Sequence, residues 1–131
     1  MVTSFGMVLP ADPRNVRIVR LVGSSIGTLG GFDDELIDDF KIALGELTST
    51  LLEVGGASPV DITFDLDDAG RVEVRGTVAV EPGATVDPMR FAFTERVLTL
   101  VADTHVFDIG ASTATLVMTI STTADLEASD A

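Results

Sequence analysis

Residues 33–54 carry an apolar stripe whose members lie three and four residues apart, as one face of a long helix requires. The stripe consists of Leu36, Phe40, Leu44, Leu47 and Leu51. Asp33 stands before it as a favourable N-cap, and Phe32 can pack onto Ile37 across the first turn. Gly55-Gly56 ends the pattern. The sequence therefore predicts a long helix that must bury one side against a second layer.

The second layer is predicted by a change of apolar period from about 3.6 to two, directly after that helix. Residues 60–66 and 71–80 both alternate between apolar and polar side chains, and the turn DDAG separates them. They are expected to form an antiparallel hairpin. Its core-facing residues would be Val60, Ile62, Phe64, Leu66, Val72, Val74, Val78 and Val80.

The other predicted elements complete a two-layer α+β sandwich. They are a strand, a helix opened by Asp12-Pro13, a helix opened by Pro88 and a strand, over residues 2–10, 12–29, 88–105 and 112–121. The third helix is expected to turn Phe93, Val97, Leu100 and Val101 inward. The expected sheet is mixed but mostly antiparallel, has about four strands, and carries three helices on one face. The domain would span residues 1–121, followed by an acidic flexible tail over 122–131.

Composition excludes several classes of function. The 131 residues include no cysteine, so disulfides and cysteine-held metals are excluded. The net charge of −13 disfavours contact with nucleic acids and anionic membranes. No apolar run is long enough for a membrane span, and the first residues do not have the pattern of a secretory signal. These features favour a cytoplasmic protein.

Three segments together resemble one family, the anti-sigma regulatory domains that act as serine-protein kinases in bacterial stress and sporulation switches. The segments are MVLPADPRNVRIVRLV, GFDDELIDDFKIALGELTST and ERVLTLVADTHVFDIGASTATLVMTI. The resemblance covers nearly the whole chain apart from the tail. It implies the ATPase fold that this family shares with histidine kinases.

The resemblance also implies a nucleotide site, which this sequence keeps only in part. Glu46 matches the family's glutamate that activates water, and Thr50 stands where the family has a magnesium-binding asparagine. The family's Asp-x-Gly-x-Gly segment is missing from VRGTVAVEPGAT, and its glycine-rich lid is missing from TVDPMRFAFTERV. We therefore expect a degenerate pocket with no cofactor, no metal site and no catalytic residue, in which Glu46 and Thr50 are remnants.

The first helix holds the candidate partner-binding residues Arg20, Gly23 and Gly27. The resemblance implies that this helix contributes to sigma-factor contact and to a homodimer face. Arginine is common at interface hot spots, but Arg20 is equally explained as an exposed helix charge. The two glycines leave bare backbone on one helix face, which suits either an internal crossing on helix 33–54 or a homodimer contact.

The function that the resemblance implies is protein binding. The expected protein is an anti-sigma-factor-like regulator of transcription that has lost ATP binding and kinase activity. Its partner would be a sigma factor or an anti-anti-sigma antagonist. One alternative is an active serine kinase with a non-standard magnesium site, and another is an oligomerisation module without a regulatory role. His105 is expected to cap a helix end, and the acids of residues 33–39 are expected to form a solvated face.

Overall fold

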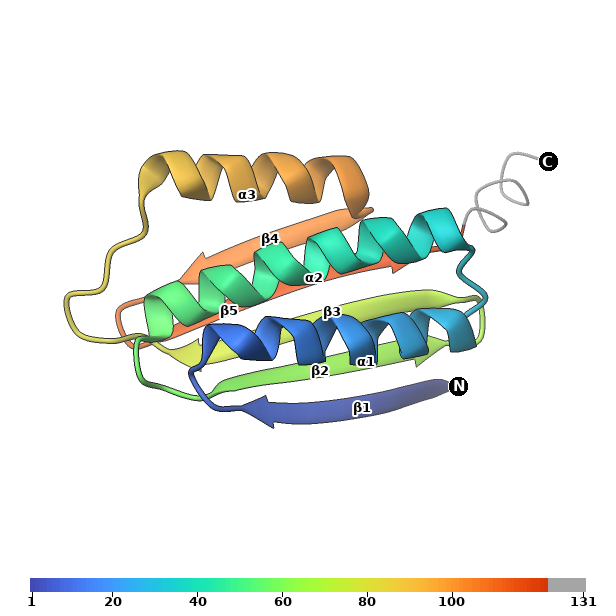
Figure 1. Ribbon diagram of the computed structural model, residues 1–131, viewed down its shortest axis with the longest axis horizontal. Helices are drawn as coiled ribbons and strands as arrows, with labels where there is room; N and C mark the ends of the chain where they lie inside the picture. The colour runs from blue at the N-terminus through green and yellow to red at the C-terminus, as the bar shows by residue number, and fades with distance from the viewer. Residues whose placement is uncertain (123–131) are drawn as a thin grey trace.

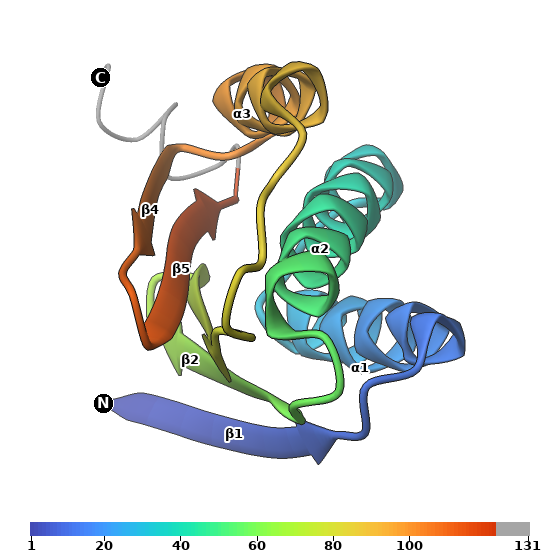
Figure 2. The same ribbon diagram turned by 90° about the vertical axis from the view of Figure 1, so that its left-hand side faces the viewer.

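The computed structural model describes residues 1–122 as a five-stranded sheet covered on one face by three helices (Figures 1 and 2). The strands lie in the order β1-β2-β3-β5-β4, and all neighbouring strands are antiparallel. This confirms the α+β two-layer sandwich. In chain order the elements are β1 (Val2–Leu9), the 3₁₀ turn η1 (Pro13–Asn15), α1 (Val16–Leu29), α2 (Asp34–Gly55), β2 (Val60–Asp67), β3 (Arg71–Ala79), α3 (Pro88–Val101), β4 (Thr104–Ile109) and β5 (Thr113–Ser121).

The number of strands and the end of the third helix differ from the prediction. The sheet has five strands where about four were expected, and within residues 1–122 it contains no parallel pair. α3 ends at Val101 because Ala102 has an extended backbone (φ −103°, ψ 153°). The chain then enters β4, the edge strand beside β5. His105 therefore lies in a strand, and the prediction that it caps a helix is wrong.

The apolar stripe of α2 is the centre of the core, as predicted. Phe40, Leu44, Leu47 and Leu51 are buried, and Leu36 is half-buried. The Phe40 ring packs edge-to-face against Phe32 at 5.5 Å and against Phe64 of β2 at 6.5 Å, measured between ring centroids. Asp33 Oδ1 accepts a hydrogen bond from the backbone N–H of Leu36 at 2.8 Å, which confirms the N-cap.

The predicted hairpin forms β2 and β3, with Val60 opposite Val78 and Phe64 opposite Val74. Its turn is held by Asp67 Oδ1, which accepts hydrogen bonds from the backbone N–H groups of Ala69 and Arg71. The apolar residues of both strands face the helices. The opposite sheet face carries polar side chains and has no covering element among the described residues, as antiparallel sheets permit.

α1 begins slightly later than predicted. Asp12 caps the short η1 turn by accepting a hydrogen bond from the backbone N–H of Arg14 at 2.9 Å, and α1 follows from Val16. The side-chain hydrogen bonds from Arg14 hold the pKa of Asp12 below its ordinary value. Leu29, the last residue of this helix, is 70% exposed.

α3 buries different residues from those predicted. Phe93 and Leu100 are exposed, whereas Thr94 and Leu98 are fully buried. Val97 and Val101, which were also expected inward, are half-buried. The helix is therefore anchored partly by a polar residue, whose bonding partner lies on α2.

Candidate functional site

Thr50, the first of the two nucleotide-site remnants, is occupied within its own helix. Its hydroxyl donates a hydrogen bond to the backbone carbonyl of Glu46 at 2.8 Å, and the residue is only 3% exposed. This is a common way for threonine to satisfy its hydroxyl inside a helix. A magnesium ion would have to replace that bond at a buried position.

Glu46, the second remnant, is held by α3. One of its carboxylate oxygens, Oε2, accepts a hydrogen bond of 2.8 Å from the hydroxyl of Thr94. Thr94 has no exposed surface, so α3 lies directly against α2 at this point. The bond satisfies a buried donor and one oxygen of a half-buried carboxylate, and charged acceptors make such bonds comparatively strong.

Side chains of α2 also fill the space between that helix and the sheet. Leu47 and Leu51 occupy the space above Gly76 of β3, which has no side chain of its own. A Cβ at Gly76 would overlap Leu51 Cδ1 and lie 3.0 Å from Leu47 Cδ2. The β3–α3 connection closes over the end of α2, because the backbone N–H of Glu81 donates to the carbonyl of Val54 at 3.0 Å.

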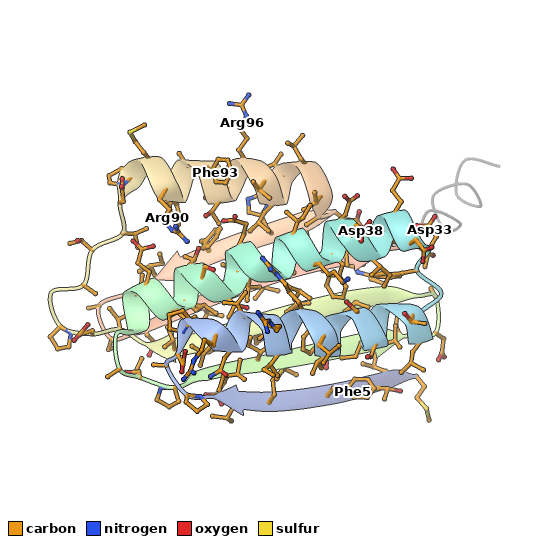
Figure 3. All side chains as sticks on the ribbon, in the orientation of Figure 1. Phe5, Asp33, Asp38, Arg90, Phe93 and Arg96 are labelled. Carbon is orange, nitrogen blue, oxygen red and sulfur yellow. The ribbon has the colours of Figure 1, made fainter. Side chains whose placement is uncertain are left out.

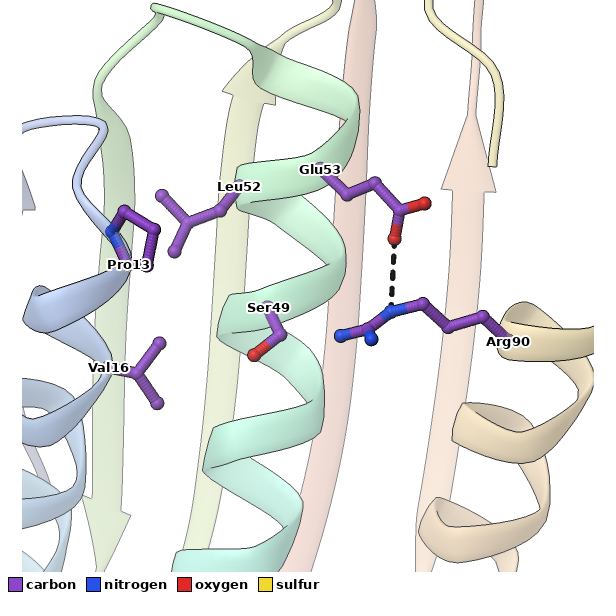
Figure 4. Close-up of a pocket in the computed structure, with 6 residues that line it drawn as sticks. All are labelled: Pro13, Val16, Ser49, Leu52, Glu53 and Arg90. Atoms are coloured by element: carbon purple, nitrogen blue, oxygen red, sulfur yellow. Dashed lines mark ion pairs between the residues drawn. The ribbon is translucent and has the colours of Figure 1, made fainter. Parts of the chain in front are cut away.

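An open groove of about 440 Å³ lies on the outer side of α2, between the starts of α1 and α3 (Figure 4). Arg90 of α3 and Glu53 of α2 form an ion pair across it at 3.1 Å. Its lining is Pro13, Val16, Ser49, Leu52, Glu53 and Arg90. Neither Glu46 nor Thr50 reaches this groove, so it does not connect to the remnants of the nucleotide site.

Gly23 and Gly27 serve the internal packing of α1 on α2. A Cβ at Gly23 would overlap Leu44 Cδ1, and a Cβ at Gly27 would lie 2.8 Å from both Phe32 Cδ2 and Ile37 Cδ1. Both glycines are buried. The internal alternative therefore accounts for them, and as buried backbone they are not part of an exposed partner surface in this fold.

Arg20 is exposed, and its guanidinium lies over Gly45 of α2. It lines a shallow groove of about 370 Å³ between α1 and α2. The other lining residues are Arg17, Leu21, Ser24 and Lys41. Of the three predicted partner-binding residues, only Arg20 is thus presented at the surface.

The acids at the start of α2 are an N-cap and exposed side chains. Asp33 is used as the N-cap, and Asp34 and Glu35 face solvent in the first turn. Among residues 1–122, no group of three or more His, Asp or Glu side chains lies close enough to hold one metal ion. Within the same residues, no helix is both long and apolar enough to cross a membrane.

Two buried threonines are not predicted by the sequence pattern. Thr94 is 48 positions away from its partner Glu46, and no local pattern marks a polar residue that another helix will satisfy. Thr48 is fully buried on α2, and its hydroxyl is the one buried side-chain polar atom in residues 1–122 without a hydrogen-bond partner. The only sequence feature that could have identified them is the position of a polar residue within or beside an apolar stripe.

No protein-family model matches the sequence, and no curated protein matches it. The candidate site is therefore defined by its geometry. That geometry joins Glu46 to α3, buries Thr50, and leaves Arg20 at a basic groove on the other side of α2.

Proposed function

We propose that this protein is an anti-sigma-factor-like regulator that binds another protein and has lost ATP binding and kinase activity. A cytoplasmic location and a role in transcription belong to the same proposal. The partner would be a sigma factor or a competing antagonist of the anti-sigma-factor, held through the exposed surface of α1. Binding would keep the sigma factor from polymerase until the antagonist competes for the same surface.

The hydrogen bond between Thr94 and Glu46 is the observation that supports the loss of ATP chemistry. A glutamate that activates water needs a free carboxylate beside a space for the substrate. Here one carboxylate oxygen accepts a hydrogen bond from the fully buried hydroxyl of Thr94, so α3 packs directly beside Glu46. Leu47 and Leu51 fill the sheet side of the same region.

The basic groove at Arg20 supports the choice of α1 as the binding surface. The chain has eight Lys and Arg residues against 21 Asp and Glu. Three of those eight, Arg17, Arg20 and Lys41, line one groove with the exposed Leu21. A local cationic patch with an apolar centre fits an acidic, amphipathic segment of a partner, because complementary charge speeds and orients docking.

Calorimetric titration with ATP and magnesium tests the loss of nucleotide binding. We expect no saturable heat up to millimolar ATP, both for the natural sequence and for the Thr50→Asn variant, because Glu46 stays bound to Thr94. Saturable binding at micromolar ATP by the natural sequence would contradict the proposal and would favour the kinase alternative.

Affinity capture from the native host tests partner binding. The tagged protein should recover a sigma factor or a single-domain antagonist, identified by mass spectrometry. Arg20→Glu should reduce that recovery at least tenfold, whereas Arg71→Glu, a matched reversal on the open sheet face, should not. Recovery of neither protein class would favour the oligomerisation module instead.

A further inference from the structure

α3 is apolar on two opposite sides. Toward the body of the protein, Leu98 is fully buried, and the Phe91 ring packs against Phe107 of β4 with 4.8 Å between centroids. On the far side Met89, Phe93 and Leu100 are 83%, 60% and 79% exposed. At roughly 100° per residue, these three lie within an arc of about 40° centred opposite Leu98.

This exposed stripe has no structural role in the described chain. It runs for about 16 Å along the helix, at a rise of roughly 1.5 Å per residue. Three large apolar side chains in one line on a 14-residue helix are more than scattered surface hydrophobicity. Large apolar side chains aligned on an exposed helix are typical of a protein–protein contact.

Arg96 completes the stripe and makes its spacing symmetrical. The four positions Met89, Phe93, Arg96 and Leu100 are separated by four, three and four residues. Figure 3 shows Arg96 projecting from the outer side of α3, away from the body. Within residues 1–122, Arg96 takes part in no ion pair.

We propose that α3 pairs with α3 of a second copy of this chain, antiparallel, about a two-fold axis that passes between residues 94 and 95. The symmetrical spacing then places Met89 opposite the partner's Leu100, and Phe93 opposite the partner's Arg96. Each contact occurs twice, as a two-fold interface requires. Met89 and Leu100 bury apolar surface, and the Arg96 guanidinium lies over the Phe93 ring as a cation–π pair.

Charge favours this surface over the rest of the molecule for self-association. Two copies that each carry −13 repel one another over most orientations. α3 contains Arg90 and Arg96 against the single acid Glu95, and Arg90 is paired with Glu53, so the outer side of the helix is close to neutral and its self-pairing meets less repulsion than contact between acidic surfaces. α3 and α1 lie at opposite borders of the helical layer, so pairing through α3 leaves the Arg20 groove open (Figure 1). The inference therefore does not rest on the proposed function.

One helix from each copy makes a small interface, near or below the lower limit for stable complexes. We therefore expect a weak dimer, with a dissociation constant on the order of 10–100 μM. Sedimentation equilibrium should show the 13.7 kDa chain doubling in mass over that range. Arg96→Glu and Phe93→Ala should each weaken dimerisation about tenfold, while Leu21→Ala, at an equally exposed site on α1, should not.

Disulfide cross-linking tests the antiparallel register directly, because the natural sequence has no cysteine. A mixture of the Met89→Cys and Leu100→Cys variants should cross-link under mild oxidation, since a disulfide needs Cα atoms only about 4.4–6.8 Å apart. Either variant alone should cross-link at least tenfold more slowly, because its two thiols are offset by about 16 Å along the helices. Leu21→Cys mixed with Met89→Cys is the collision control.

Three results would overturn the proposal. The first is a natural sequence that stays monomeric at 1 mM. The second is a dimer whose affinity is unchanged by both Arg96→Glu and Phe93→Ala. The third is cross-linking of the Met89→Cys and Leu100→Cys mixture at no more than the rate of the Leu21→Cys control. Circular dichroism of every variant establishes that the fold is intact, so none of these results can be attributed to unfolding.

Discussion

Thr48 carries the clearest energetic cost of any single residue in the described chain. Its hydroxyl is buried without a partner, and an unsatisfied buried hydroxyl costs roughly 1–3 kcal/mol. We expect Thr48→Val, which keeps the shape and a similar helix propensity, to raise the free energy of unfolding by about 1 kcal/mol in urea titrations. Thr50→Val is the matched control, because Thr50 loses a real hydrogen bond. A larger gain at Thr50 than at Thr48 would contradict this assignment.

Two helix glycines should respond to alanine in opposite directions. At Gly23 the added methyl overlaps Leu44, which is fully buried, so its displacement would disturb the surrounding core and we expect a net loss of about 1–2 kcal/mol from overpacking. At Gly45 the three atoms nearest to the added methyl all belong to the Arg20 guanidinium, the end of an exposed and flexible side chain. Gly45→Ala should therefore stabilise the protein by about 0.5–1 kcal/mol through helix propensity. Urea unfolding midpoints measure both, and stabilisation by Gly23→Ala would refute the close α1–α2 crossing.

At the scale of elements, α3 is held on α2 by the hydrogen bond from Thr94 to Glu46. Hydrogen bonds to charged groups contribute roughly 1.5–3 kcal/mol, so Thr94→Val should lower the free energy of unfolding by about that amount. Thr94→Ser, which keeps the hydroxyl, should lose less. A double-mutant cycle with Glu46→Ala should give a coupling of at least about 0.5 kcal/mol. Additive effects of the two substitutions would show that the contact does not stabilise α3.

The elements with a single clear period were predictable from sequence, and the others were not. The α2 stripe and the β2–β3 hairpin each have one apolar face, which fixes their type and direction. β4 is six residues long and pairs only with β5, and its sequence THVFDI does not alternate clearly between apolar and polar residues. It also follows directly on the helical pattern of α3, so the sequence did not separate the two elements. α3 has apolar residues on both sides, so its pattern did not identify Phe93 and Leu100 as exposed. A buried Thr94 is explained only by Glu46, which no local pattern links to it.

The residues of the candidate site could be predicted from the sequence, but their contacts could not. Glu46 and Arg20 were identified from the sequence because they match positions of the family that the chain resembles. What Glu46 contacts depends on how α3 is placed, and that placement follows from the packing of the whole helical layer. The alternative for Gly23 and Gly27 could be chosen only after the α1–α2 crossing was known.

At the scale of the whole molecule, the excess of negative charge should make stability depend on salt. With a net charge of −13, added NaCl should raise the free energy of unfolding by screening repulsion. One local repulsion is identifiable, because Asp65 of β2 stands directly opposite Glu73 of β3 on the open sheet face. Like charges in that position cost roughly 0.2–1 kcal/mol; because Glu73 also pairs with the exposed Arg75 at 3.7 Å, a weak contact, Glu73→Gln should recover only part of that cost in 10 mM salt.

The control for that variant is Glu95→Gln on α3, which removes the same charge where no like charge stands directly across a strand. If the Asp65–Glu73 repulsion is local, Glu73→Gln gains more stability than Glu95→Gln at low salt, and the difference shrinks at 0.5 M NaCl, where the screening length falls to about 4 Å. Equal gains from the two variants would mean that only total charge matters. In that case the acidic surface as a whole, and not the pairing of β2 with β3, would set the salt dependence of this fold.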